Sequence, residues 1–376
     1  MDSVIIFGLG PAGLFLSREL AKNDAHTIGI GRKDDVGLFS KYVEPFVAET
    51  KVEVMNVIRK IRERNSGPLT GYICSDQYLT LLLNDCPEIF EIINFVGVKK
   101  ENYELINNKQ KITELCTELG LRTPHSYSYQ DLLSNKVELP IAFKLNTKEI
   151  NSKKNPIGKL KVIKNEKELN NLKEDISISQ IEKDKIVVQE YIEGNNKHQF
   201  SFGGYFIKGV KQAGIIVNQI GQYPQGVSSL VLEAEEGEIK NKINESVIKF
   251  AGHLKYTGFL EMEFKVCKEV IYLMDINPRT WGWVSILAKK YPGFHNVLCT
   301  NNKVPIDKIP ELVMWKSPMR IFMGNFKNPL NEKKLTGRLK KYKKSNIAYD
   351  LYDPSDIKPL LAILQVSVMK LKKKFR

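Results

Sequence analysis

The sequence predicts an α/β (α+β) protein with a parallel, doubly wound unit at its N-terminal end and a larger mixed unit behind it. An apolar run over residues 3–8 leads through a glycine-rich turn into a helical pattern over residues 14–22, as at the start of a doubly wound sheet. Apolar strand patterns at 141–145 and 258–277 carry charged side chains inside them or at their ends. The chain has 376 residues, more than one hydrophobic core normally supports, so we expect two or three domains.

Composition limits the class of protein. Hydrophobic residues make up 42% and charged residues 27%, as in ordinary globular proteins. The net charge of +14 is spread along the chain except for basic clusters at 333–344 and 370–376, and no aromatic-interleaved nucleic-acid motif accompanies them. We therefore expect no nucleic acid partner, and a solvated lysine-rich surface explains the charge equally well.

The cellular setting follows from cysteine usage and hydropathy. The five cysteines are scattered, odd in number and without C-x-x-C spacing, which favours a reduced environment without disulfides or a zinc site. No apolar run reaches the length of a membrane span. The first residues, MDSVIIFGLG, begin a strand without a basic stretch, so we expect no signal peptide and a cytoplasmic protein.

The N-terminal unit is expected to continue with one strand and two helices. Residues 26–30 form the candidate second strand. Residues 51–64 form an amphipathic helix that ends at the Asn-Ser-Gly-Pro sequence of 65–68. Its apolar face consists of Val54, Val57, Ile58 and Ile61. Residues 76–83 form another helix, with Ser75 or Asp76 as its N-cap.

Gly8, Gly10 and Gly13 match the G-x-G-x-x-G pattern between a strand and a helix, which is typical of dinucleotide binding. The pattern also requires an acidic residue at the end of the second strand, to hold a ribose hydroxyl. The chain has Arg32 near that point, which could serve a 2′-phosphate instead. The alternative is a tight strand-to-helix turn in a domain that binds no nucleotide, and both interpretations stay open.

The second unit is expected to contain a helix at 109–119 ended by Gly120, strands at 141–145, 161–164 and 185–189, and helices at 166–172 and 240–254. Lys144 lies within an apolar strand, where a lysine needs a partner, and a phosphate group would be one. The alternative is an edge strand with Lys144 facing water.

The segment 258–283 contains the strongest candidate for a chemical site. Glu263 lies on one apolar strand, and Asp275 and Asn277 lie at the end of the next. Two carboxylates and an amide from adjacent strands can bind Mg²⁺ or Mn²⁺, which prefer oxygen ligands. Arg279 follows directly and could neutralise a phosphoryl group or an anionic intermediate. The alternative is that Asp275 and Asn277 only form a turn.

Six segments follow one another along the chain in a characteristic order. They are CSDQYLTLL at 74–82, NNKQKITELCTELGLRTPHS at 107–126, LPIAFKL at 139–145, VVQEYIEG at 187–194, QYPQGVSS at 222–229, and GFLEMEF with YLMDINPRTWG within 258–282. Taken in this order, the segments resemble the ATP-grasp superfamily and specifically its carboxylate–amine ligase branch. The resemblance covers most of the chain from residue 1 to about 300.

The resemblance implies a domain layout. Residues 1–105 would form a Rossmann-like pre-ATP-grasp domain, and residues 106–305 the ATP-grasp domain. The latter would have a small lid lobe at about 125–195 and a large lobe at about 196–305. Residues 306–376 would form a basic C-terminal helical extension.

The resemblance also implies roles for individual residues. The implied cofactors are ATP and Mg²⁺ or Mn²⁺, with Glu263, Asp275 and Asn277 binding the metal and Arg279 stabilising an acyl-phosphate state. The residues implied to hold ATP are Lys109 and Lys144 at the phosphates, Lys159 or Lys161 in the phosphate-covering loop, Glu190, Tyr191 and Ile192 at the adenine, and Glu193 at the ribose. The chain departs from the family pattern in having Asp275 where glutamate is usual, and in a loop, 153–161, that retains only Gly158.

The activity implied is that of an ADP-forming ligase, which activates a carboxylate as acyl phosphate and joins it to an amine. Its substrates would be small or lipid-linked molecules, and a homodimer is a common assembly for such chains. Trp281 and Trp283 would line an acceptor pocket or pack in the core. Two alternatives remain, an oxidoreductase that binds NAD(P) or FAD at the glycine-rich turn, and a catalytically silent ATP-binding homologue.

The last 27 residues run from an acidic start through an apolar block into a basic end. A helix of this composition can lie in a membrane interface, which would bring the protein to the inner membrane face and to a cell-envelope or polysaccharide intermediate. The alternative is a helix packed on the body of the protein with a solvated basic tail.

Overall fold

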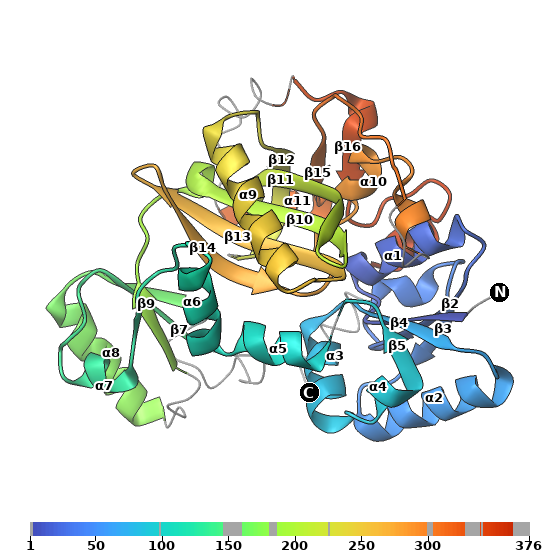
Figure 1. Cartoon of the computed structure of the whole chain (residues 1–376), viewed down its shortest axis with the longest axis horizontal. Helices are drawn as coiled ribbons and strands as arrows, with labels where there is room; N and C mark the ends of the chain where they lie inside the picture. Colours follow the sequence, from blue (N-terminus) through green and yellow to red (C-terminus); the bar gives the residue numbers. More distant parts are fainter. Residues whose placement is uncertain are drawn as a thin grey trace.

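The computed structural model describes residues 3–97, 99–145, 160–179, 186–224, 226–298, 304–327, 339 and 341–363. Its strands form three sheets, and the helices α5 (Lys100–Asn107) and α6 (Lys109–Glu118) run between the first and second of them (Figure 1). Among the described residues, no helix is both long enough and apolar enough to cross a membrane.

The N-terminal sheet has five parallel strands in the order β3-β2-β1-β4-β5. They are β1 (Ser3–Phe7), β2 (His26–Gly31), β3 (Glu44–Val47), β4 (Leu69–Ile73) and β5 (Ile93–Phe95). The helices of this unit are α1 (Pro11–Ala21), α2 (Lys51–Arg64), α3 (Asp76–Thr80), a π-helical turn (Leu81–Asp85) and α4 (Ile89–Ile92).

The helix predictions for this unit follow from capping and amphipathicity. The buried residues of α2 are the four that the sequence predicts, and they pack against β1 and β2. Thr50 and Glu53 form a reciprocal capping box at its start. Ser75 is the N-cap of α3, because its hydroxyl accepts the N–H of Tyr78 at 3.2 Å.

The second sheet is antiparallel, with four strands in the order β6-β9-β7-β8. They are β6 (Ser126–Tyr127), β7 (Ile141–Leu145), β8 (Leu160–Ile163) and β9 (Ile186–Glu190). Helices α7 (Tyr129–Leu133) and α8 (Glu166–Ser179) share a core with one face of this sheet, around Phe143 and Leu172. Helix α8 is longer than the 166–172 that the sequence predicts.

The third sheet has seven strands in the order β14-β13-β10-β11-β12-β15-β16. They are β10 (Gln199–Ile207), β11 (Val210–Gln222), β12 (Ser228–Glu233), β13 (Gly258–Cys267), β14 (Val270–Asn277), β15 (Met314–Lys316) and β16 (Ile347–Tyr349). Helix α9 (Glu238–His253) lies across one face (Figure 1), where Val247 and Phe250 pack with Phe202 and Met262. The other face shares a core with the N-terminal sheet, so the two sheets are joined by packed side chains.

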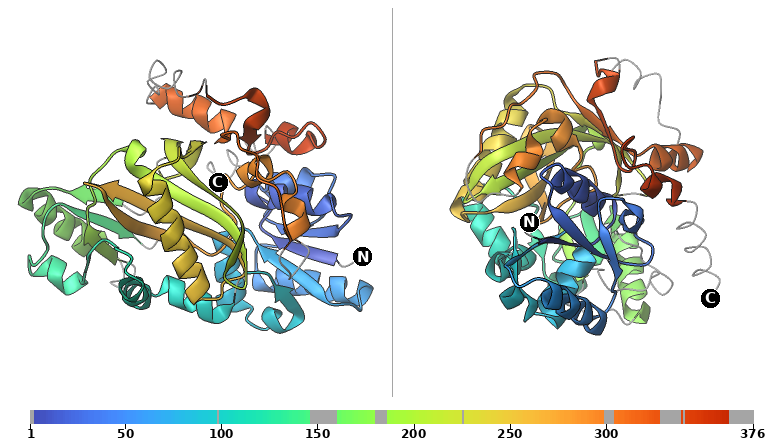
Figure 2. Two further views of the ribbon diagram at one scale, coloured as in Figure 1. Left: turned by 45° about the horizontal axis from the view of Figure 1, so that its top comes forward. Right: turned by 90° about the vertical axis from the view of Figure 1, so that its right-hand side faces the viewer.

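The C-terminal segment is not helical throughout, because β15 and β16 extend the seven-stranded sheet beyond residue 305. Helices α10 (Ile286–Lys290), α11 (Pro318–Lys327) and α13 (Lys358–Leu361) accompany them. These orange to red elements gather at the β15–β16 edge of the sheet (Figure 2). Of the segment 350–376 that carries the candidate interfacial helix, residues 350–363 contain only the short helix α13, and 364–376 lie outside the described residues.

A buried ion pair ties the C-terminal segment to the N-terminal unit. Arg18 of α1 donates from Nε to Asp356 at 3.0 Å, and its other nitrogens donate to the carbonyl oxygens of Leu351 and Asp356. The Asp356 carboxylate also accepts the Ser40 hydroxyl at 2.7 Å. Because both charged groups are buried and hydrogen-bonded, this contact fixes residues 351–356 on α1.

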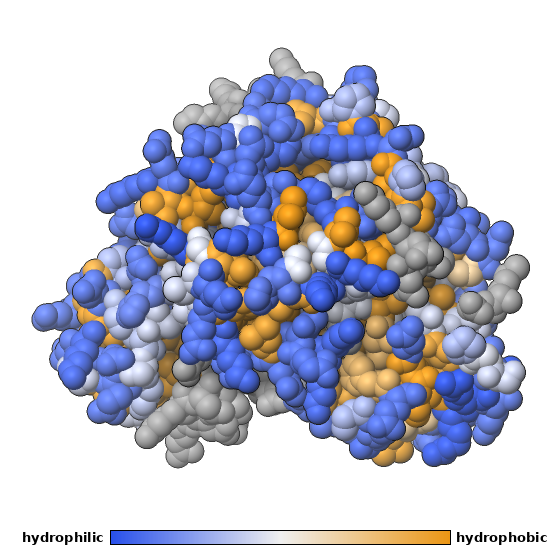
Figure 3. Space-filling view, viewed as in Figure 1, coloured by the Kyte–Doolittle hydropathy of each residue, from blue (hydrophilic) through white to orange (hydrophobic). Residues whose placement is uncertain are grey.

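Hydrophilic side chains cover most of the face seen in Figure 3, and apolar ones gather mainly over the N-terminal unit at lower right. The four described cysteines, Cys74, Cys86, Cys116 and Cys267, are free thiols.

Candidate functional site

The strand pair β13–β14 brings the predicted acidic residues together. In its antiparallel register Glu263 lies directly opposite Asp275, and Glu261 lies directly opposite Asn277. Residues paired in this way, or two apart on one strand, point to the same face of the sheet. Three carboxylates and an amide therefore project from one small area, and the sequence identifies all of them except Glu261.

Asp275 is accessible to solvent, although protein atoms crowd the surroundings of its carboxyl group. Burial raises the pKa of its carboxyl group, and the positive charges of Lys144 and Arg279 act against that rise. Lys144 belongs to β7, so a charge from the second sheet acts on Asp275 in the third.

Glu261 is a functional candidate that the sequence reasoning missed. It is 5% exposed, and burial together with the charge of Glu263 raises the pKa of its carboxyl group well above the usual range. Asn277 Nδ2 donates to its Oε2 at 3.1 Å, and Trp283 Nε1 donates to its Oε1 at 3.0 Å. The available signal was the Glu-x-Glu spacing of 261 and 263, which places both side chains on one face of a strand.

Trp281 and Trp283 are core residues. They are 2% and 1% exposed and pack beside Gly203 of β10, where a Cβ atom would lie 2.2 Å from Trp281. Of the two interpretations that the sequence left open, the structure supports packing.

Arg279 is held by the N-terminal unit. Its guanidinium donates to both oxygens of Asp76 at 2.7 and 2.6 Å, to the Thr280 carbonyl at 2.7 Å and more weakly to Asn277 Oδ1 at 3.4 Å. Burial lowers the pKa of Arg279, but the hydrogen bonds and charge of Asp76 outweigh that effect and raise it. Arg279 thus lies beside the carboxylates, in a fixed orientation.

Lys144 has a second cation as its neighbour. Burial lowers the pKa of Lys265 on β13, and the charge of Lys144 lowers it further, while Glu193 acts in the opposite direction. The Lys265 ammonium also lies 5.0 Å from the ring centre of Tyr191. Lys144 also acts on Asp275, and Lys265 lies two residues after Glu263, so these two mutually repelling lysines form a place where an anion would be stabilised. Sequence reasoning missed Lys265 because only strand pairing places it here.

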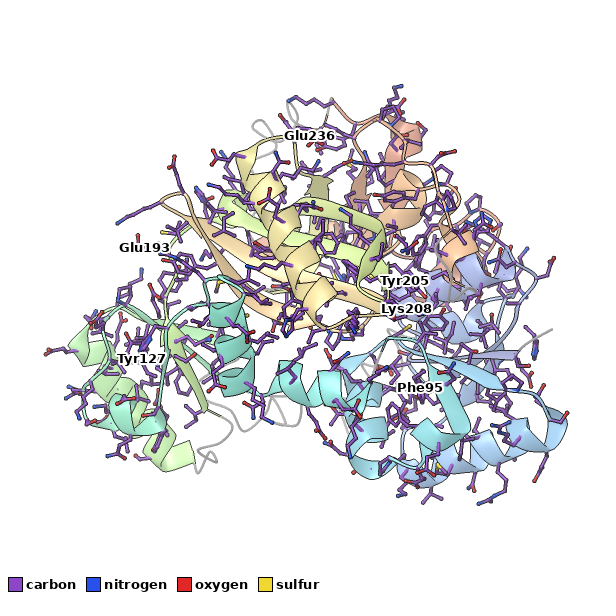
Figure 4. All side chains as sticks on the ribbon, in the orientation of Figure 1. Phe95, Tyr127, Glu193, Tyr205, Lys208 and Glu236 are labelled. Carbon is purple, nitrogen blue, oxygen red and sulfur yellow. The ribbon has the colours of Figure 1, made fainter. Side chains whose placement is uncertain are left out.

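The predicted adenine-binding segment follows β9, where the chain passes from the second sheet to the third (Figure 4). Glu190 is fixed on both sides, since its N–H donates to the His125 carbonyl and its carboxylate accepts the His125 N–H. The Tyr191 N–H donates to the carbonyl oxygen of Pro140 at 3.1 Å. Within the described part of the chain, the N–H of the buried Ile192 makes no hydrogen bond. Such a donor normally has a partner, so it is available to a ligand.

Lys161 does not belong to this group. On β8 it pairs with Phe143, so it points to the helix-covered face of the second sheet, and its ammonium binds Asp175 of α8 at 3.1 Å. Lys144, one residue after Phe143, points to the opposite face. The structure therefore gives Lys161 another partner and does not support the prediction that it contacts phosphate. Lys159 and the side chain of Lys109 lie outside the described residues.

The glycine-rich turn has structural reasons for two of its three glycines. Gly8 has φ +94°, and a Cβ on Gly13 would lie 2.0 Å from the Gly8 carbonyl oxygen. A Cβ on Gly10 would meet nothing within 4 Å. The Leu9 N–H already donates to the Asp35 carboxylate at 3.0 Å, which leaves one donor fewer for a phosphate group.

Arg32, the other candidate for dinucleotide binding, is also engaged. Its guanidinium donates to Gln77 at 2.7 Å and lies 3.5 Å from Asp34. A 2′-phosphate would have to displace these partners, which favours the structural interpretation of this turn.

No protein-family model matches the chain. Among curated proteins, the carbamoyl phosphate synthase large chain of Haemophilus ducreyi is 22% identical over 240 residues, which are 59% of this chain and 20% of that protein. The chain therefore spans about a fifth of that relative's length.

Solved structures resemble the whole architecture more closely. The biotin carboxylase domain of Hydrogenobacter thermophilus 2-oxoglutarate carboxylase, solved with MgADP and bicarbonate, has a TM-score of 0.63 and 13% identity, covering 83% of this chain and 73% of that one. The N5-carboxyaminoimidazole ribonucleotide synthetase of Thermus thermophilus has a TM-score of 0.62 and 13% identity, and the match covers 83% of this chain and 82% of that one. The L-amino acid ligase of Bacillus licheniformis has a TM-score of 0.56 and 14% identity, and the match covers 82% of this chain and 75% of that one. The chain therefore has the ATP-grasp fold.

Proposed function

We propose that this protein is a ligase that uses ATP and Mg²⁺ to activate a carboxylate as an acyl phosphate and then joins it to an amine. The observation that supports this most strongly is the pairing of Glu263 with Asp275, on which the charge of Lys144 acts from a different sheet. The three structural relatives named above have the same fold, and one is described as a ligase and one as a synthetase.

The described residues fit a nucleotide. The N–H of Ile192, which has no hydrogen-bond partner among the described residues, would meet the adenine edge, and Lys144 and Lys265 would hold phosphate oxygens. An anion there would reduce the repulsion between the two ammonium groups. Glu193, which is exposed and near Lys265, would reach the ribose.

The residues also fit a magnesium ion that is held partly by phosphate. Among the described residues, no set of three or more histidine, cysteine, aspartate or glutamate side chains is arranged to hold a metal alone. Glu263, Asp275 and the amide oxygen of Asn277 would provide part of a coordination shell, and nucleotide phosphates commonly provide the rest for Mg²⁺. When bound, the ion offsets negative charge that develops during phosphoryl transfer.

The residues of the chain would then position the reacting groups and neutralise their negative charge. Lys144 and Lys265 orient the transferred phosphoryl group, and Arg279 holds a positive charge beside the carboxylates. The carboxylate substrate attacks the terminal phosphorus, ADP leaves, and the amine then displaces phosphate from the acyl carbon. No side-chain nucleophile is required.

Thermal shift with and without ligand tests this proposal. The proteins are the wild type, the double variant Asp275→Asn/Asn277→Ala and a matched control. The control is Asp85→Asn, which changes an exposed carboxylate in the π-helical turn of the N-terminal unit. We expect Mg-ATP to raise the melting temperature of the wild type and the control, and the double variant to lose that shift. NAD(P)H and FAD should stabilise none of them.

Two other results would overturn the proposal. Stabilisation by a dinucleotide, with no effect of Mg-ATP, would move the functional site to the turn at Gly8–Gly13. Tight Mg-ATP binding without ADP release, across a wide panel of carboxylates and amines, would identify a catalytically silent nucleotide-binding protein.

We further propose that the basic C-terminal end brings the protein to an anionic membrane surface, where a lipid-linked cell-envelope intermediate would be the acceptor. The support is the sequence of 364–376, an apolar block followed by a run of lysines. A chain ending at residue 363 retains the Arg18–Asp356 contact. We expect the full chain to sediment with phosphatidylglycerol vesicles, and the chain that ends at residue 363 to stay in solution. Equal binding of both chains would refute this proposal.

A further inference from the structure

The outward side of α11 is apolar. Met319, Phe322 and Met323 are 38%, 65% and 46% exposed. On a helix with 3.6 residues per turn, these three positions fall on one side. Single exposed apolar side chains are common on protein surfaces, but neighbouring ones that form a patch mark a contact surface.

The opposite side of α11 faces the body of the protein. Ile321 packs on the cluster that contains Ile220 and Met314. A Cβ atom on Gly324 would lie 3.3 Å from the side chain of Tyr223, so the helix approaches the chain closely at this point. Helix α11 is therefore fixed to the body by one side and presents apolar side chains on the other, whereas the outward side of a surface helix is usually polar.

The charge around α11 is positive. Residues 312–331 contain Lys316, Arg320 and Lys327 and no acidic residue. Residues 306–376 contain 17 basic and 6 acidic residues, so +11 of the net charge of +14 lies in the last fifth of the chain. Lys316 precedes the helix by two positions, and Lys327 is its last residue. Basic residues at the ends of a helix that lies in a membrane interface can reach lipid phosphate groups while the apolar side enters the bilayer.

This charge discriminates between partners for the apolar side of α11. A second copy of the chain would bring two surfaces of the same sign together, and like charges oppose that contact. The surface of an anionic membrane offers an apolar interior together with a negative potential. It therefore matches both properties of the α11 surface.

We propose that α11 binds an anionic membrane by inserting Met319, Phe322 and Met323 into the headgroup region. The inference rests on the proposed membrane association and goes beyond it, because α11 belongs to the folded body and is separate from the proposed contact at 364–376. A single weak contact binds membranes reversibly, and stable anchoring takes two. With α11 as the second contact, the protein would have a fixed side toward the membrane.

The test is sedimentation of the full chain with vesicles made of equal parts of phosphatidylglycerol and phosphatidylcholine. Phe322→Ser/Met323→Ser removes two apolar side chains from α11. The matched control, Val52→Ser/Ile248→Ser, removes two exposed apolar side chains from α2 and α9. The same substitutions are made in the chain that ends at residue 363. The melting temperature and its Mg-ATP shift show that each protein is folded.

We expect the α11 double variant to bind these vesicles at least about tenfold more weakly than the wild type, and the control to bind like the wild type. Vesicles of phosphatidylcholine alone should bind all of them weakly, because the basic residues then lack anionic partners.

A fluorescent variant gives a second measurement that does not depend on loss of binding. The three native tryptophans, Trp281, Trp283 and Trp315, are buried and provide a constant background. The added emission of Phe322→Trp should shift to shorter wavelength with anionic vesicles and be quenched by lipids brominated on their acyl chains. Val52→Trp should show neither effect.

Equal vesicle binding by the wild type and the α11 double variant would overturn the inference. If the chain ending at residue 363 nevertheless loses binding, the proposed contact at 364–376 stands. If that shorter chain binds like the full chain, and the α11 substitutions abolish binding of both, α11 stands and the contact at 364–376 fails.

A wild type that binds no vesicles would overturn both membrane proposals. A dimer of the wild type that the α11 double variant does not form, measured by sedimentation velocity, would then assign the surface to a second copy of the chain. The Mg-ATP shift tests the ligase proposal separately, because none of these substitutions lies among the proposed nucleotide and metal ligands.

Discussion

The guanidinium of Arg279 and the carboxylate of Asp76 face each other in two parallel hydrogen bonds, Nε to Oδ1 at 2.7 Å and NH2 to Oδ2 at 2.6 Å. Asp76 begins α3 in the N-terminal unit, and Arg279 follows β14 of the seven-stranded sheet. Paired contacts of this kind fix orientation as well as distance. The N-terminal unit therefore helps to set the position of a charge beside Asp275.

We expect Asp76→Asn to lower turnover more than nucleotide binding. The substitution removes a charge-assisted contact worth about 1.5–3 kcal/mol, which corresponds to roughly a 10–100-fold change if all of it reaches the rate. ADP release would measure kcat, and the Mg-ATP thermal shift would report binding. Asp85→Asn serves as the control, and an unchanged kcat in Asp76→Asn would contradict the positioning role.

We expect Glu261→Gln to weaken Mg²⁺ binding, although Glu261 is not itself a proposed metal ligand. The Glu261 carboxylate accepts the amide N–H of Asn277 and so orients the Asn277 carbonyl oxygen, which accepts weakly from Arg279 at 3.4 Å and is the proposed ligand of the ion. Partners of this kind typically change metal affinity about 10–100-fold. The Mg²⁺ concentration that gives half of the ATP thermal shift measures the effect. Glu269→Gln, in the β13–β14 turn region, should leave that concentration unchanged.

Lys265→Met should have opposite effects on the free protein and on ATP binding. Both burial and Lys144 disfavour its charge, so the folded-state pKa lies below the usual lysine value. The fold carries the full penalty at pH values below the folded-state pKa, and this penalty disappears only above the unfolded pKa. The variant should therefore unfold at a higher urea concentration without ligand, yet bind Mg-ATP about 10–100-fold more weakly. Equal ATP affinity would exclude Lys265 from the site.

Glu19→Gln should stabilise the protein at neutral pH. Glu19 is 4% exposed, and its Oε2 has no hydrogen-bond partner within the described residues. Burial raises its pKa, and Lys22 acts against that rise. A raised folded-state pKa means that stability is full below the unfolded pKa of about 4.3 and declines as pH rises through the folded value.

Urea denaturation at several pH values would test this effect of Glu19. The glutamine variant should have a larger free energy of unfolding than the wild type at pH 7.5, and this difference should shrink toward pH 4. A constant difference across this range would point to lost packing or to the lost Lys22 contact rather than to ionisation.

Local patterns were sufficient for much of the fold. The buried face of α2, the Ser75 cap and the carboxylates opposite each other on β13 and β14 follow from spacing along a helix or strand. The extended helix α8 and the strands β15 and β16 depend on tertiary packing, which short apolar runs do not reveal.

The site was less predictable where distant segments meet. No local pattern connects Asp76 with Arg279, which are 203 positions apart. Lys161 was assigned by its place in a loop, but strand alternation turns it toward Asp175. Lys265 and Glu261 lie within the strand that the sequence identified, yet their neighbours come from other strands and another sheet.

The contact between Arg18 and Asp356 has a consequence for synthesis of the chain. The two residues are 338 positions apart, so Arg18 leaves the ribosome long before its buried counter-charge exists. Helix α1 can form early, but its docking on the completed protein must wait, because a buried guanidinium without a partner is costly. This contact can therefore form only after residue 356 has emerged, and until then Arg18 stays in water.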